Sequence, residues 1–125
     1  MKVRFAFVCD DVRREENGKL IFLGAYGPNI LPTAIPATMV LALVAGMDVS
    51  EPSEVDTKFQ VMMDGERIIH GGGSLKASLA GFNFFPIKNI PLHMKEPGIL
   101  DFQLQIADGE WQSVYTVPVE VKPST

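Results

Sequence analysis

The chain has 125 residues, of which 46% are hydrophobic, and carries a formal net charge of −4 with a pI of about 5.1. This length and apolar content predict one folded domain with its own core and exclude an intrinsically disordered chain. The acidic balance and scattered cations argue against nucleic acid or an anionic membrane as partner, because both select basic surfaces.

Turn-forming residues recur at short intervals along the chain, with β-branched and aromatic runs between them. This rhythm predicts an all-β fold: a two-sheet antiparallel β-sandwich of about eight strands in Greek-key or related order, with a partly closed barrel as the alternative. Residues 1–121 are expected to form this single domain, and 122–125 a short C-terminal tail. The candidate strands are Val3–Cys9, Val12–Glu16, Lys19–Tyr26, Met39–Met47, Lys58–Met63, Glu66–His70, Ser74–Leu79, Phe84–Leu92, Ile99–Ile106 and Trp111–Val121.

The first strands flank an Asn17-Gly18 pair, which is a favoured two-residue hairpin turn. In the register of such a turn Val12 pairs with Leu23, so the second strand is apolar on both faces. The core face carries Ile21, Leu23 and Ala25, and the outer face carries Leu20, Phe22 and Tyr26. A strand of this kind is either covered on its outer side or part of an interface.

Leu20, Phe22 and Tyr26 are therefore the candidate interface, for a protein partner or for a second copy of the chain. The alternative is a register that is off by one, in which case these residues belong to the core and Ile21 and Leu23 face out. A homodimer is favoured, because most soluble oligomers are closed assemblies of identical chains. A weaker candidate is the apolar, loop-like segment 81–86, which presents Phe82, Phe84 and Phe85.

Two later hairpin turns predict which side chains face the core. A turn at Asp64-Gly65 pairs Phe59 with His70 and places this histidine at the edge of the core. A two-residue turn at Asp108-Gly109 places Trp111, the only tryptophan, in or at the rim of the core. A tryptophan in that position weakens the case for a sugar-binding surface, which needs an exposed aromatic ring.

The residue types of common enzyme and metal sites form no recognisable pattern. Cys9 ends an apolar strand beside two aspartates, which raise a thiol pKa, so a small core residue is expected. His70 and His93 have no metal-ligand spacing, and the acidic segment 48–56 does not match an EF-hand, although calcium binding there stays an alternative. The glycines at 71–73 predict a mobile or bulged connection rather than a phosphate loop. We expect no catalytic residues, no metal and no cofactor.

The apolar run after Lys2 and Arg4 is too short for the core of a secretion signal, so a cytoplasmic location is expected. The single cysteine gives no internal disulfide.

Three N-terminal motifs together carry a resemblance to a known family. They are Cys9-Asp10-Asp11-Val12-Arg13, Asn17-Gly18-Lys19-Leu20 and Leu23-Gly24-Ala25-Tyr26-Gly27. They resemble the opening of a small bacterial family of domains of unknown function. The resemblance implies a stand-alone bacterial β-domain and brings no activity, cofactor or site residue. The function that best fits these observations is a non-enzymatic, protein-binding or self-associating module. A small-ligand or carbohydrate-binding sandwich is the alternative, and an enzyme is the least favoured.

Overall fold

The computed structural model describes residues 1–121, and this part of the chain contains eight strands and no helix. The tail expected over 122–125 lies outside the described residues. The strands are β1 (Lys2–Arg14), β2 (Leu20–Ala25), β3 (Ala37–Val49), β4 (Ser53–Met63), β5 (Glu66–Ala77), β6 (Gly81–Met94), β7 (Gly98–Ile106) and β8 (Gln112–Val119).

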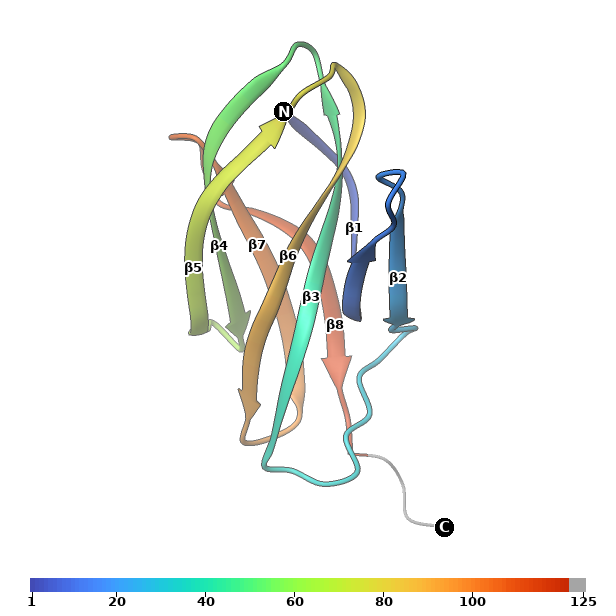
Figure 1. Cartoon of the computed structure of the whole chain (residues 1–125). Helices are drawn as coiled ribbons and strands as arrows, with labels where there is room; N and C mark the ends of the chain where they lie inside the picture. The colour runs from blue at the N-terminus through green and yellow to red at the C-terminus, as the bar shows by residue number, and fades with distance from the viewer. Residues whose placement is uncertain (122–125) are drawn as a thin grey trace.

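The strands form two four-stranded antiparallel sheets that pack face to face (Figure 1). Sheet A has the order β2-β1-β3-β6, and sheet B has the order β5-β4-β7-β8. Between the sheets, β1 lies near β8 and β5 lies near β6. The predicted β-sandwich is therefore confirmed, and the barrel alternative is not adopted because each sheet keeps its own pair of edge strands.

The core fills the space between the two sheets. Alternate residues of each strand point into it, as the apolar residues of β7 illustrate, and the largest fully buried side chains come from both sheets. They include Leu41, Leu43, Met47, Ile90, Leu92, Met94, Leu100, Phe102 and Leu104.

The three glycines at 71–73 lie within β5 and pair with residues 57–59 of β4, so the connection predicted there is wrong. The glycine at 71 is needed for packing, because a Cβ there would lie 2.6 Å from Cε1 of Phe59. The segment stays extended since its backbone forms a regular ladder with β4.

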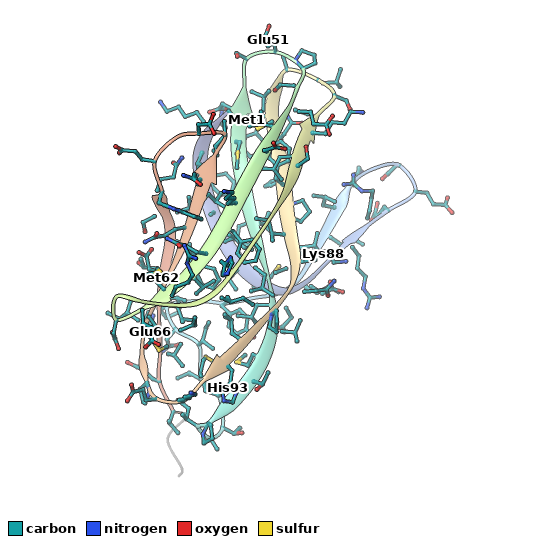
Figure 2. The ribbon with its side chains drawn as sticks, turned by 90° about the vertical axis from the view of Figure 1, so that its left-hand side faces the viewer. Met1, Glu51, Met62, Glu66, Lys88 and His93 are labelled. Atoms are coloured by element: carbon teal, nitrogen blue, oxygen red, sulfur yellow. The ribbon has the colours of Figure 1, made fainter. Side chains whose placement is uncertain are left out.

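The first hairpin is one residue out of the predicted register. Val12 pairs with Phe22, not with Leu23, because the turn is longer than two residues and closes between Arg14 and Leu20. The Asn17 side chain supports this longer turn by accepting a hydrogen bond from the Lys19 amide at 3.0 Å. The hairpin reaches away from the body of the sandwich (Figure 2). The residues expected in the core, Ile21, Leu23 and Ala25, are accordingly exposed.

His70 does not lie at the edge of the core as predicted, because a β-bulge shifts the register of its strand. Asp64 and Gly65 both have positive φ, as a two-residue turn requires, but the register shifts between Val61 and Met62. Beyond the shift His70 pairs with Gln60 instead of Phe59 and is exposed.

Trp111 does not occupy its predicted position either, because a second bulge shifts the register between β7 and β8. Phe102 pairs with Tyr115 as predicted, but the register then shifts, so that Leu104 pairs with Gln112. The connection between β7 and β8 is longer than a two-residue turn and holds Trp111 outside the strands, half-buried and apart from the core residues. The expectation that Trp111 lies in or at the rim of the core is wrong.

Candidate functional site

Five phenylalanine rings contact one another on the outer face of sheet A, which sheet B does not cover. We call this surface the phenylalanine patch; its members are Phe5, Phe7, Phe22, Phe82 and Phe84. They come from β1, β2 and β6, so strands distant in sequence build one surface. The shortest centroid separations are 4.9 Å for Phe82–Phe84 and 5.0 Å for Phe7–Phe22, both edge to face. This geometry suits the aromatic quadrupole and stabilises the cluster.

The rings lie close to the sheet because β3 presents small side chains beneath them. Ala42 and Val44 are almost completely buried there, together with Cys9 and Val12 of β1. Gly46 is the closest approach: a Cβ at this position would lie 2.7 Å from Cζ of Phe82 and 3.0 Å from Cζ of Phe5. Sheet A is therefore covered by apolar side chains on both of its faces.

The patch nevertheless presents large apolar groups to solvent. Phe5, Phe82 and Phe84 keep 43%, 39% and 37% of their surface exposed. Phe7 and Phe22 are half-buried beneath and beside them. A contiguous exposed aromatic surface of this kind marks an interaction site more often than scattered apolar residues do.

Charges of both signs border the patch. At one end Arg4 pairs with Asp48 through Nη2 and Oδ1 at 2.6 Å, and its guanidinium carbon lies 4.7 Å from the centroid of Phe82. At the other end Lys88 and Arg13 approach Asp11 at 3.3 and 3.5 Å. The hydrogen bond from the Val12 amide, followed by the contact with Lys88, lowers the pKa of the Asp11 carboxyl.

The structure brings together most of the predicted interface residues. Leu20 and Phe22 pack on the outer face of sheet A, and Phe82 and Phe84 lie beside them on the same face. The two candidates separated in the sequence are thus one surface, and segment 81–86 is part of a strand and not a loop. Phe85 points the other way and is buried in the core.

Tyr26 does not belong to the patch. The chain passes through Gly24, which has a φ of +67°, and Tyr26 then packs against the main core. Its hydroxyl donates a hydrogen bond of 2.6 Å to Oδ1 of Asp10. Burial, and then the contact with this carboxylate, raise the pKa of the Tyr26 phenol.

Phe5 and Phe7, two members of the patch, were not among the predicted interface residues. The available signal was the alternation of Phe5, Phe7 and Cys9 along the first strand, whose intervening residues Ala6 and Val8 are also apolar. This strand has the same two-faced character that was recognised for the second strand.

Cys9 lies beneath the patch and is inaccessible to solvent. Burial raises the pKa of its thiol, the neighbouring Asp10 carboxylate raises it further, and Sγ donates a hydrogen bond to the Asp11 carbonyl at 3.4 Å. We expect the thiol to react with Ellman's reagent in the folded protein far more slowly than a free thiol, and at the ordinary rate in denaturant. Absorbance at the thionitrobenzoate band follows the reaction. Rapid native-state modification would contradict the buried placement of Cys9.

The remaining polar candidates are dispersed. His93 lies on β6 with Nδ1 2.8 Å from Oγ1 of Thr38, and Asp48 of the acidic segment is paired with Arg4. Over residues 1–121 no three side chains of the His, Cys, Asp or Glu type gather as metal ligands would. The same part of the chain has no helix with the length and apolar character to cross a membrane.

A model of a protein family, described as "Family of unknown function (DUF6941)", matches residues 4–120. The chain belongs to this family. The match spans both sheets and every member of the patch, and it agrees with the resemblance to a family of unknown function. No curated protein matches the sequence.

In this DUF6941 chain, residues of the N-terminal motifs serve the structure where β1 and β2 pair. The Asp10 side chain occupies the space where a Cβ of residue 24 would lie, with its Cγ 2.9 Å from that position. Oδ1 of Asp10 accepts a hydrogen bond from the Tyr26 hydroxyl. The aspartate, the glycine and the tyrosine therefore hold the end of the hairpin together. We call this arrangement the Asp10–Gly24–Tyr26 clasp. It accounts for three motif residues without a catalytic role.

Proposed function

We propose that this chain is a non-enzymatic protein-interaction module that self-associates through the phenylalanine patch. The observation that carries the proposal is the set of five mutually packed rings on the open face of sheet A, three of them between 37% and 43% exposed. In line with the family resemblance we propose a bacterial origin, and we propose separately a cytoplasmic location.

The energetic argument is the apolar surface that the patch leaves in water. Fully burying one large apolar side chain contributes about 1.5–3 kcal/mol, and the rings are already fixed by their neighbours. Ordering them on binding therefore costs little rotamer entropy, which improves the net free energy of association. An outer sheet face with this composition is better suited to contact with protein than to solvent.

The charges around the patch favour a second copy as the partner. Arg4 and Asp48 stand at one end, and Asp11, Lys88 and Arg13 at the other, so each end carries both signs. In a dimer with a two-fold axis through the patch, the patch of one copy faces the same patch of the other copy. Positive groups at the border of one copy can then face negative groups at the border of the other, so the surface is self-complementary. A border of one sign would instead have favoured a partner of opposite charge.

The test is the mass of the purified protein by size-exclusion chromatography with light scattering. The wild type is expected at twice the 13.7-kDa mass of the chain. Phe84→Glu is expected to give a folded monomer, because it places a charge at the centre of the interface while the residue is already 37% exposed. The matched control is Leu79→Glu, which changes a 75% exposed leucine outside the patch and should stay dimeric.

Three outcomes would overturn the proposal. One is a wild type that remains monomeric at a concentration of about 1 mM, where even a weak specific dimer is substantially populated. Another is a Phe84→Glu variant that remains dimeric. The third is unfolding of both Phe84→Glu and Phe5→Glu, seen as loss of the β signal in circular dichroism, which would make the patch a part of the core.

A further inference from the structure

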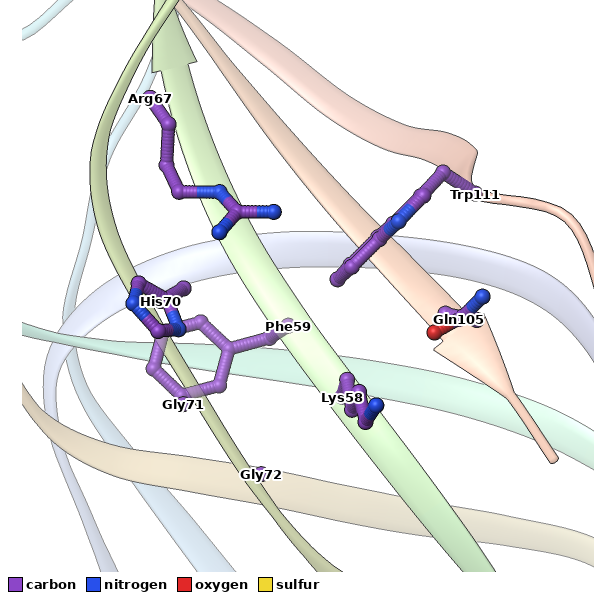
Figure 3. A pocket seen from close by; sticks show the side chains of 8 residues that line it. All are labelled: Lys58, Phe59, Arg67, His70, Gly71, Gly72, Gln105 and Trp111. Atoms are coloured by element: carbon purple, nitrogen blue, oxygen red, sulfur yellow. The ribbon is translucent and has the colours of Figure 1, made fainter. Parts of the chain in front are cut away.

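The outer face of sheet B carries a hollow of about 580 Å³ beside Trp111 (Figure 3). Side chains of β4, β5, β7 and the following turn line it. The residues that matter for its chemistry are Lys58, Arg67, His70, Gly72, Gln105 and Trp111. This surface is on the opposite side of the sandwich from the phenylalanine patch and, unlike the patch, carries cationic side chains beside its aromatic ones.

The hollow is cationic in a protein of net charge −4. Lys58 and Arg67 line it and form no ion pair with any of the residues that the structure describes, and His70 adds an imidazole. Within residues 1–121 no carboxylate contributes to its lining. The nearby carboxylates line adjoining hollows instead: Glu54, Asp56 and Asp108 in one that shares Lys58, and Asp64, Glu66 and Glu96 in one that shares Arg67. Within this hollow the cationic lining favours an anionic group on the ligand.

The position of Arg67 is set by a chain of hydrogen bonds that crosses the sheet. Its Nε donates to Oε1 of Gln60 at 2.9 Å, and Nε2 of Gln60 donates to Oε1 of Gln103 at 2.6 Å. Gln103 in turn donates to Asp101, which also accepts a hydrogen bond from Ser113. Because Gln60 is only 6% exposed, this chain holds Nε in place and leaves the two terminal nitrogens of the guanidinium for a ligand.

An aromatic platform and an open wall complete the hollow. Figure 3 shows Arg67 reaching across β4 toward the indole of Trp111, with Gln105 farther along β7. Arg67 forms no cation–π contact with Trp111; the contact of this kind in the described part of the chain joins Arg4 and Phe82. The space between guanidinium and indole is thus not closed by stacking. On the β5 side Arg67 and His70 contribute side chains, whereas Gly72 contributes backbone alone and leaves the wall open at that position.

We propose that this hollow binds an acidic saccharide, with one carboxylate-bearing pyranose ring between Trp111 and Arg67. The indole packs against the C–H face of the sugar, and the guanidinium donates two hydrogen bonds to the carboxylate. Lys58 adds a second cation, and the Gln105 amide bonds to ring hydroxyls. The hollow lies open on a sheet face, so a saccharide of several units can lie across the sheet with one of its rings in the hollow. The proposal does not depend on self-association.

The test uses trigalacturonic acid as the probe and the fluorescence of Trp111, the single tryptophan of the chain, as the readout. The wild type is expected to show a saturable change with a Kd of roughly 0.1–1 mM. Arg67→Gln, and separately the methyl ester of the probe, should each weaken binding about tenfold or more, because each removes one member of the guanidinium–carboxylate pair. The matched control is Lys76→Gln, which removes an exposed cation of the same strand away from the hollow and should bind as the wild type does.

Calorimetry of the same titration guards against a binding event that leaves the indole emission unchanged. Absence of heat and of a fluorescence change up to roughly 10 mM probe would overturn the proposal. Equal affinity for the acid and its ester would also overturn it, because the cations would then have no role. So would tighter binding of adenosine monophosphate than of the trisaccharide, which would assign the hollow to nucleotides. Phe84→Glu should retain binding, which separates this test from that of the dimer.

Discussion

Replacing Phe102 with alanine is expected to lower the free energy of unfolding by about 3–5 kcal/mol. The ring is fully buried between the two sheets, on a strand whose neighbours Leu100 and Leu104 are equally buried. Removing it leaves a cavity that rigid sheets on both sides cannot close. Chemical denaturation followed by circular dichroism measures the loss, which is a large part of the roughly 5–15 kcal/mol typical of a domain.

Trp111→Ala is the matched comparison, because it removes a larger aromatic side chain from the same hairpin. It should cost less than about 1.5 kcal/mol, since Trp111 is half-buried on the outer face of sheet B and apart from the core. The native indole emission should correspondingly be that of a partly hydrated ring. A cost for Trp111→Ala equal to that of Phe102→Ala would contradict the shifted register of β7 and β8.

Gly24→Ala is expected to lower the free energy of unfolding by about 2–4 kcal/mol. Two effects combine. The residue has a φ of +67°, which strains any side chain, and the new Cβ would collide with the Asp10 carboxylate. Moving that carboxylate breaks its hydrogen bond with the Tyr26 hydroxyl. Thermal and chemical unfolding both report the change.

Gly27→Ala is the control within the same sequence motif. A Cβ there meets no atom within 4 Å, and its φ lies outside the left-handed region, so the variant should unfold as the wild type does. Asp10→Ala in the Gly24→Ala background should recover the part of the loss that comes from the collision, leaving the backbone strain. Additive effects of the two substitutions would show that the clasp is not formed.

The fold class could be predicted from the sequence because its signals are local. Period-two alternation marks β7, and the Asp64-Gly65 pair has the positive φ values that a two-residue hairpin turn needs. Such patterns depend on a few neighbouring residues. These patterns can therefore be recognised in the sequence without knowing which strands pair with one another.

Strand register was harder to predict, because one extra residue reverses every side chain beyond it. The bulge between Val61 and Met62 turned His70 outward, and the shift after Phe102 released Trp111 from the core. Neither bulge has a glycine or another mark in its own sequence. The longer turn after Arg14 produced the same kind of error in the first hairpin.

The phenylalanine patch was predicted in fragments for a different reason. Phe22 and Phe84 were each recognised as candidates, but β1 and β3 lie between their strands in sheet A. Their rings meet, 5.2 Å apart, across the small side chains that these two inner strands present on that face. Strand order is a long-range property that periodicity does not encode. Gly46 shows the same limit, because nothing in the sequence tells that two rings lie on it.

The two layers of the sandwich expose chemically different surfaces, an aromatic patch on sheet A and a hollow with a cationic lining on sheet B. A dimer joined through sheet A would direct its two sheet B hollows outward, on opposite sides of the assembly. Such an assembly is bivalent. Toward a polymer that repeats its binding unit, the second contact would form at a high effective concentration, so the avidity of the dimer would exceed the affinity of either hollow by orders of magnitude.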